Sequence, residues 1–177
     1  SRDEMFIMEE TVLSQASEVP TIVDGRLEAH SGGFNSKSHP VFGVIKTHQH
    51  IPFDLSRLRL LYALQPGERL PAFIHAPGKR LTTLTWYLRI AEAAGESPLD
   101  GVVRIEVSLE WYETFAQNTN FVDRLSRLVM AYRCQDQSYS RANISLEPIV
   151  RGERQLGAVF GKYDFLFNQF LHISHLN

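Results

Sequence analysis

Residues 21–28 read T-I-V-D-G-R-L-E and residues 41–49 read V-F-G-V-I-K-T-H-Q, and the fold prediction starts from these two runs. Both are apolar and β-branched, which is typical of strands. The Gly, Ser and His residues between them predict a loop over 30–40. Each run carries a charge near its C-terminal end, Asp24 on the first and Lys46 on the second. An Asp-Gly turn and a solvated Lys would explain both charges. A carboxylate beside an ammonium on neighbouring strands would instead hold a metal ion or a phosphate.

Length and composition indicate one globular domain over residues 1–177. The chain is 44% hydrophobic and 21% charged, with a formal net charge of −2, so no strong overall field attracts it to nucleic acid or to anionic lipid. A single cysteine, Cys134, excludes an intramolecular disulfide framework and a Cys-rich zinc site, and it is expected to be a buried, inert thiol. We find no apolar run of ~20 residues and no secretory signal, and therefore expect a cytoplasmic protein with no membrane span.

The rest of the chain alternates strand and helix patterns, which predicts an α/β domain with a mixed sheet of about five strands flanked by helices. Beyond the two runs above, strands are expected at 71–75, 81–90 and 101–109. Helices are expected at 1–20, 52–64, 121–133, 151–160 and 164–171, with an extended segment at 144–150 because it contains Pro148.

The run at 101–109 has the clearest alternation of the chain. Glu106 shares one side of this strand with Arg104, while the other side is apolar. A solvent-exposed strand face explains this pattern. The alternative places Glu106 near Asp24, so that both carboxylates hold one divalent cation. Two strand carboxylates are fewer than the three or four that two-metal phosphodiester hydrolysis uses.

Several familiar catalytic signatures are missing. The seven histidines form no zinc motif, and no loop matches a dinucleotide or phosphate-binding fingerprint. No nucleophile elbow is present. Basic side chains such as Arg57 and Arg59 fit either phosphate contacts or a solvated helix face.

An ordered series of motifs resembles the C-terminal half of the NurA family of DNA-end-processing nucleases, in a divergent bacterial form. The series is V-D-G-R-L at 23–27, V-F-G-V-I-K-T-H-Q at 41–49, G-E-R-L-P-A-F at 67–73, W-Y-L-R at 86–89, G-V-V-R-I-E-V at 101–107, and N-I-S-L-E-P-I at 143–149 followed by G-E-R-Q-L.

The resemblance implies an RNase H-like fold, a homodimer, and DNA cleavage that depends on Mn²⁺ (or Mg²⁺) in partnership with a HerA-type hexameric ATPase. Asp24 resembles the second Asp-Gly of the family site, which makes it a catalytic residue and a metal ligand. Lys46 resembles the family lysine, which would stabilise the scissile phosphate. Glu106 is the other candidate metal ligand, from the strand pattern.

The chain departs from the family pattern in two places. The family's first Asp-Gly and its Glu belong upstream, where the residues before 20 are too few to hold them. Glu153 stands where the late His is expected. Two interpretations stay open: a fragment lacking the N-terminal half of the active site, or a degenerate relative.

Three functional hypotheses follow. The first is a metal-dependent nuclease domain. The second is a non-catalytic dimerisation or ATPase-docking module, which would use aromatic side chains expected at the surface, namely Trp111, Tyr112, Phe165 and Phe167. The third is an α/β domain that binds a small molecule and has no role on DNA.

Overall fold

A computed structural model describes residues 20–29, 39–48, 51–76, 81–93, 97–117, 120–136 and 144–160, apart from the side chains of 29, 153 and 156–160. The strands are β1 (Thr21–Asp24), β2 (Val41–Ile45), β3 (Phe73–His75), β4 (Thr83–Arg89) and β5 (Val102–Ser108). The helices are the 3-10 turn η1 (Leu27–Ala29), α2 (Leu55–Ala63), α3 (Leu109–Phe115), α4 (Phe121–Ala131) and α5 (Glu147–Phe160). The helices predicted at 1–20 and 164–171 lie outside the described residues.

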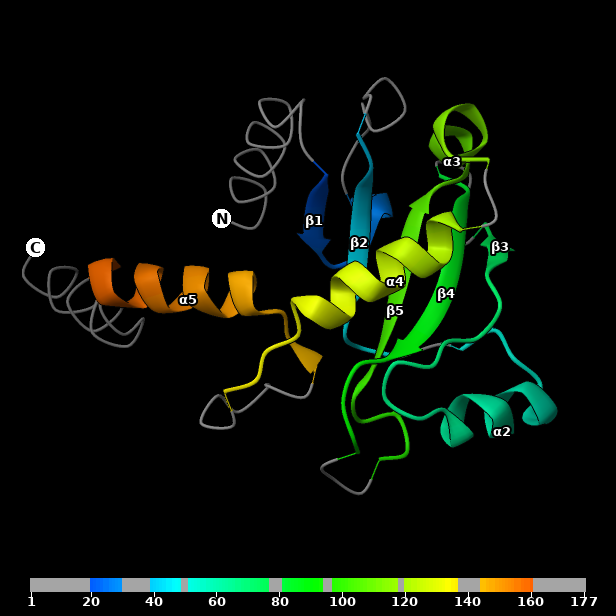
Figure 1. The fold of residues 1–177 in the computed structure, drawn as a ribbon, viewed down its shortest axis with the longest axis horizontal. Coiled ribbons are helices and arrows are strands. Elements are labelled where there is room, and N and C mark those ends of the chain that lie inside the picture. Colours follow the sequence, from blue (N-terminus) through cyan, green and yellow to red (C-terminus); the bar gives the residue numbers. More distant parts are fainter. Residues whose placement is uncertain are drawn as a thin grey trace, which may run out of the picture.

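The five strands form one mixed sheet in the order β1-β2-β5-β4-β3 (Figure 1). β1 and β2 are parallel, and the other three pairings are antiparallel. The predicted α/β class and the mixed sheet of about five strands are therefore confirmed. β2 is buried along its whole length, as its nearly continuous apolar sequence predicts.

Two features of the chain differ from the elements predicted. Residues 109–115 form α3, which we did not expect: Ser108 caps it by accepting a hydrogen bond from the Trp111 backbone N–H at 3.3 Å. The extended segment at 144–150 is wrong from Glu147 onward, because α5 begins there and Pro148 lies in its first turn. Proline is tolerated at that place because the first helical N–H groups have no intrahelical acceptor.

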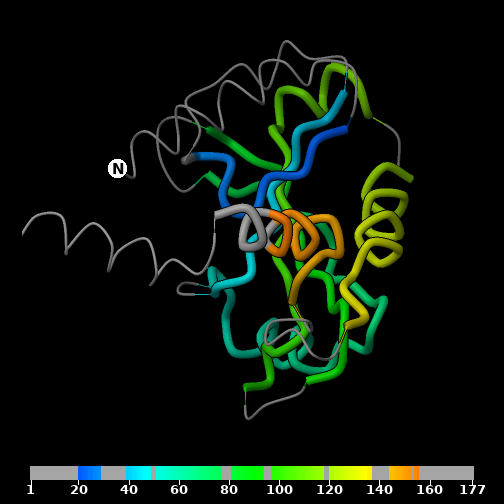
Figure 2. Tube along the Cα trace, turned by 90° about the vertical axis from the view of Figure 1, so that its left-hand side faces the viewer, coloured from blue at the N-terminus to red at the C-terminus, as the bar shows by residue number. Residues whose placement is uncertain are grey.

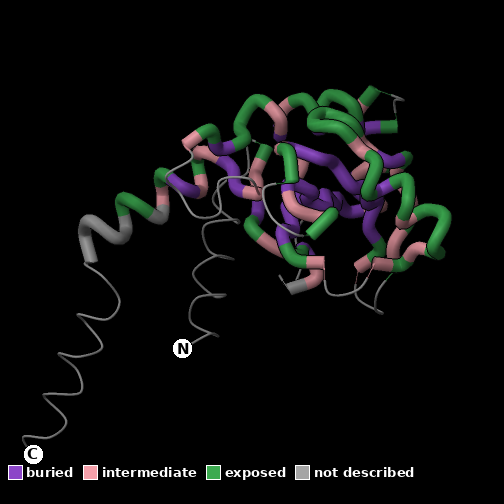
Figure 3. Tube along the Cα trace, turned by 90° about the horizontal axis from the view of Figure 1, so that it is seen from below, coloured by how far each residue is buried: buried purple, intermediate pink, exposed green. Residues whose placement is uncertain are grey.

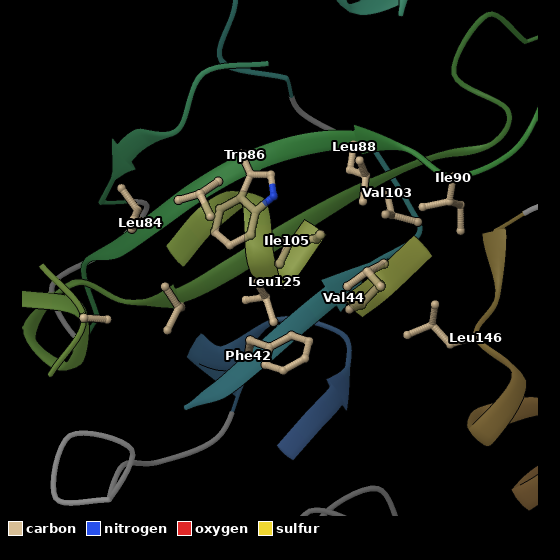
Figure 4. Close-up of a cluster of buried hydrophobic side chains, with 14 of the residues drawn as sticks. Phe42, Val44, Leu84, Trp86, Leu88, Ile90, Val103, Ile105, Leu125 and Leu146 are labelled. Atoms are coloured by element: carbon tan, nitrogen blue, oxygen red, sulfur yellow. The ribbon is translucent and has the colours of Figure 1, made fainter. Parts of the chain in front are cut away.

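One side of the sheet, which we call the α4 face, carries the main hydrophobic core. Side chains of β2, β4 and β5 alternate onto this face and meet Leu125 and Val129 of α4 (Figure 4). Trp86 lies at its centre and donates its indole N–H to Ser126 Oγ at 3.0 Å. The strand members of this cluster are Phe42, Val44, Leu84, Trp86, Leu88, Val103, Ile105 and Val107.

The opposite side, which we call the polar face, is built differently. Two separate apolar clusters lie on it: one contains Val23, Leu27 and Val41, and the other joins Leu61 of α2 to Tyr87. Between them the strands present polar side chains, namely Thr83, Thr85, Arg104 and Glu106. In Figure 2, α4 lies on one side of the sheet and the turn after β1 lies on the other.

All of these polar strand residues are buried, so the interpretation of Arg104 and Glu106 as a solvent-exposed strand face was wrong. The buried residues gather along the strands, and the exposed ones lie mainly on the surrounding helices and loops (Figure 3). Among the described helices, none combines the length and the apolar character needed to cross a membrane.

Candidate functional site

The turn that follows β1 places the V-D-G-R-L motif against the sheet. The chain leaves β1 at Asp24 and turns at Gly25, whose φ of 134° favours glycine. The turn passes directly over Gly43 of β2, because a Cβ on that residue would lie 2.5 Å from the carbonyl oxygen of Gly25. Two glycines thus allow the backbone of one strand to cross its neighbour at close range.

Asp24 and Lys46 are brought together at the C-terminal ends of the two parallel strands. Lys46 Nζ donates to Asp24 Oδ2 at 2.7 Å. The Lys46 side chain is only 3% exposed, whereas the Asp24 side chain is 42% exposed. A buried ammonium therefore holds a carboxylate whose other side remains open to solvent.

Glu106 lies on β5, directly across from Gly43, where the turn meets the polar face. Its Oε1 accepts a hydrogen bond from the Leu27 backbone N–H at 2.6 Å, and its Oε2 lies 3.5 Å from a guanidinium nitrogen of Arg104. Both side chains of this pair are less than 10% exposed. Burial raises the pKa of Glu106, an effect that the Leu27 hydrogen bond and the positive charge of Arg104 partly oppose. Glu106 is thus a desolvated carboxylate held in a fixed position.

The strand register separates the two predicted metal ligands. Asp24 lies beside Val44, which pairs with Ile105, and this row points to the α4 face. Glu106 lies in the neighbouring row, where it pairs with Gly43. The side chains of this row point to the polar face. Successive strand residues point to opposite faces. The structure therefore does not support one cation held by both carboxylates, and the separate assignment of each as a metal ligand stays a prediction.

A polar cavity of about 340 Å³ opens beside Glu106. Its lining comprises Arg26, Glu28, Ile51, Pro52, His75, Leu81, Thr83, Arg104 and Glu106. Burial lowers the pKa of His75, and the positive charges of Arg104 and Arg26 lower it further. The cavity is therefore lined by two guanidinium groups, two carboxyl groups and an imidazole that resists protonation.

Sequence reasoning singled out Glu106 but missed most of its partners in this cavity. Arg26 and Glu28 are adjacent to the V-D-G motif, while His75 and Thr83 come from β3 and β4, which pair in register. The alternation of polar residues on β4 and β5 was the available signal, but the same alternation is expected of a strand face exposed to solvent. Only the covering turn and the 51–53 segment, which are features of the tertiary structure, make this face a cavity instead of an exposed surface.

In the described part of the chain, no three His, Cys, Asp or Glu side chains lie close enough together to hold a metal ion. His48 Nε2 lies 2.9 Å from the Val102 carbonyl oxygen, and burial lowers the pKa of this imidazole. Cys134 is buried and free, as expected.

One of the four aromatic side chains expected at the surface, Trp111, is not there, and Tyr112 is only partly exposed. Trp111 is buried in the main core, and Tyr112 packs against Phe121 with ring centroids 5.7 Å apart. Phe165 and Phe167 lie outside the described residues. The exposed large apolar side chains that the structure does show include Leu55, Leu60 and Tyr62 on α2 and Ile74 on β3.

Comparison with known proteins leaves the resemblance to NurA nucleases as a prediction from the motifs. No model of a known protein family matches the chain, and no curated protein matches it significantly.

Proposed function

We propose that this chain is a DNA-processing domain of the NurA type that takes part in metal-dependent phosphodiester hydrolysis. The Asp24–Lys46 pair carries the proposal. In sheets with parallel strands, ligands commonly bind outside the carboxyl ends of those strands, and this pair lies at the carboxyl ends of β1 and β2.

The chemistry of the pair suits a phosphate and a divalent cation. The open side of the Asp24 carboxylate can ligate Mn²⁺ or Mg²⁺, which both prefer oxygen ligands. The buried Lys46 ammonium is held in place without long side-chain motion, so it can stabilise the negative charge that develops on the phosphate. Asp24 is thus the metal ligand and Lys46 the electrostatic catalyst of the proposed reaction.

The remaining parts of the proposal come from the resemblance. An RNase H-like topology, a homodimer and a HerA-type ATPase partner belong to it, and so do the further carboxylates that a two-metal site needs beside Asp24. Glu106, on the opposite face, has no role in the hydrolytic step of this proposal.

The test is DNA degradation in the presence of Mn²⁺ by the wild-type chain, by Asp24→Asn and by Lys46→Met. We expect cleavage that both substitutions abolish. Asp123→Asn is a matched control, because it removes another half-exposed carboxylate from a 2.7 Å ion pair. Asp123 lies in the first turn of α4 and pairs with Arg69. Equal cleavage by wild type and Asp24→Asn would remove Asp24 from the reaction.

The second candidate function is a non-catalytic docking module. The observation that favours it is the exposed apolar surface of α2, where Leu55 is 67% exposed and Tyr62 is 42% exposed. A wild-type chain that binds DNA but does not cleave it with Mn²⁺, and that loses its ATPase partner when Leu55 is changed to Ser, would establish this alternative.

A further inference from the structure

The polar face carries a second cavity that adjoins the first. This cavity has a volume of about 550 Å³ and is lined by Pro52, Phe53, Arg57, Leu60, Leu70, Pro71, Ala72, Phe73, Ile74 and His75. Pro52 and His75 belong to the linings of both cavities. Each volume falls in the range of small-molecule sites. The two cavities therefore adjoin at these two residues, and we call them together the groove, polar at the Glu106 end and aromatic at the Phe73 end.

The polar end contains an unused hydrogen-bond donor. Arg104 is only 7% exposed, and its Nε has no hydrogen-bond partner among the described residues. Buried polar atoms without a partner are rare in folded proteins and point to a missing ligand, ion or water. Arg104 also lines the polar cavity, so its guanidinium is available to a group that enters it.

The aromatic end brings three rings together edge to face. Phe53 and Phe73 have ring centroids 5.2 Å apart and planes inclined by 63°, and Phe73 and His75 have ring centroids 6.3 Å apart and planes inclined by 73°. All three side chains are only partly buried, so part of their surface faces the groove. Burial, together with the positive charges of Arg104 and Arg26, lowers the pKa of His75, so this ring becomes charged less readily than an exposed imidazole.

Positive charge exceeds negative charge along the groove. Its two linings together contain three arginines, Arg26, Arg57 and Arg104, and two glutamates, Glu28 and Glu106. The Leu27 backbone N–H and Arg104 already engage Glu106. Arg57 is exposed at the aromatic end, and Arg26 is exposed at the polar end. An exposed cation therefore lies at each end of the groove.

We propose that this groove holds unpaired nucleotides of a DNA strand, with bases stacked against Phe73 and His75 and phosphates beside Arg57 and Arg26. The proposal rests on the proposed function only in taking DNA as the polymer. Single-stranded nucleic acid is bound by this combination of stacking rings and cations, because the faces of unpaired bases are accessible. Arg104 Nε donates to the base edge or phosphate at the polar end.

The location of the groove assigns it a positioning role rather than a catalytic one. The groove lies on the polar face, whereas Asp24 and Lys46 lie at the strand ends toward the α4 face. A strand held in the groove would cross the β1–β2 edge to reach the proposed hydrolytic site. Binding in the groove and cleavage at Asp24 can thus be measured independently.

The test is binding of a fluorescently labelled oligo-dT strand by anisotropy, in EDTA so that no cleavage occurs. We expect Arg57→Ala to weaken binding by at least about fivefold and to reduce the slope of log K against log salt by about 0.7. Arg59→Ala is the matched control, since Arg59 is equally exposed on α2 but does not line the groove. Its dissociation constant should stay within about twofold of wild type.

Stacking is tested by Phe73→Leu and, without any change to the protein, by an oligonucleotide whose bases are replaced by abasic sites. Each should weaken binding by at least about fivefold, because base–aromatic stacking contributes on that scale. Melting temperatures identify a variant that has not folded, and the abasic strand tests the proposal in that case.

Three results would overturn the inference: equal binding by Arg57→Ala and Arg59→Ala, no preference for the normal strand over the abasic one, or equally tight binding of a duplex of the same length. A wild-type chain that binds oligo-dT through the groove but does not cleave DNA with Mn²⁺ would reject the proposed function alone. A chain that shows Asp24-dependent cleavage, but whose oligo-dT binding does not respond to the groove variants, would reject the groove alone.

Discussion

The two faces of the sheet are both buried, but they are stabilised in different ways. On the α4 face one continuous apolar cluster runs from Phe42 to Val129. On the polar face two small apolar clusters flank buried Arg104, Glu106, Thr83 and Thr85. Apolar burial stabilises in proportion to area, whereas buried polar groups are tolerated only with partners. The α4 face therefore provides stability, and the polar face provides a cavity with fixed chemical groups.

The largest expected effect is on the α4 face. Trp86→Ala removes a fully buried indole and leaves Ser126 Oγ without the donor that it accepts from, so we expect a loss of about 3–5 kcal/mol in the free energy of unfolding. Urea denaturation measures it. Thr85→Val changes the adjacent residue, on the polar face. It alters little volume but removes the 2.8 Å hydrogen bond with the Thr83 hydroxyl, so the loss should be smaller, about 1–3 kcal/mol. Similar losses for both variants would remove the contrast between the faces.

The next effect concerns the contact between the β1 turn and β2. Gly43→Ala places a Cβ 2.5 Å from the Gly25 carbonyl oxygen, which is backbone and cannot rotate away. We expect a loss of about 1–3 kcal/mol, from overpacking and from displacement of Leu27 away from Glu106. Gly152→Ala, in α5 with open space around it, is the control and should not destabilise the protein. A stable Gly43→Ala variant with an unshifted Leu27 amide resonance would show that the turn is not tightly seated.

The pH dependence of stability is expected to differ between the two faces. The polar face has the buried carboxyl group of Glu106, whereas the core residues of the α4 face include no carboxylate. Burial raises the folded-state pKa of Glu106, so the folded protein holds this proton more tightly than the unfolded chain. The resulting stabilisation is fully present below the ordinary glutamate pKa and is lost as pH rises through the folded-state pKa. Glu106→Gln cannot titrate. The unfolding free energy of wild type, relative to Glu106→Gln, should fall across this window by at most about 1.4 kcal/mol per pH unit.

Carbon-13 NMR of the Glu106 carboxyl group measures the same shift directly. A midpoint at or below the ordinary value of 4.5, together with a flat stability difference, would mean that Arg104 and the Leu27 amide outweigh burial.

The smallest expected change in stability is at the strand ends. Asp24→Asn breaks the ion pair with Lys46, but the Asp24 side chain is 42% exposed, so solvent screens the interaction and the loss should stay below about 1 kcal/mol. Thermal unfolding checks this value. A loss above about 3 kcal/mol would indicate that the pair is a structural ion pair of the core rather than part of an open site.

Local sequence determined the main elements of this protein. β-branched and aromatic runs specify β2, β4 and β5, and the apolar stripe with 3.6-residue period specifies α4. The meeting of Asp24 with Lys46 also followed from sequence, because two consecutive strands with charged ends were expected to be neighbours. α3 was missed because seven residues that directly follow a strand give little periodicity, although Ser108 is a capping residue.

Tertiary structure alone decided the polar face. The sequence pattern of Arg104 and Glu106 is the same whether that side meets water or protein. The Gly25 turn folded over Gly43 and the 51–53 segment together cover it. The strand register decided the positions of the two carboxylates. Side chains alternate between the faces with a period of two residues, and the observed register places Asp24 and Glu106 on opposite faces. No local signal in the sequence fixes which strand residues lie side by side. The separation of the strand-end pair from the arginine-lined groove is therefore a consequence of pairing between distant segments.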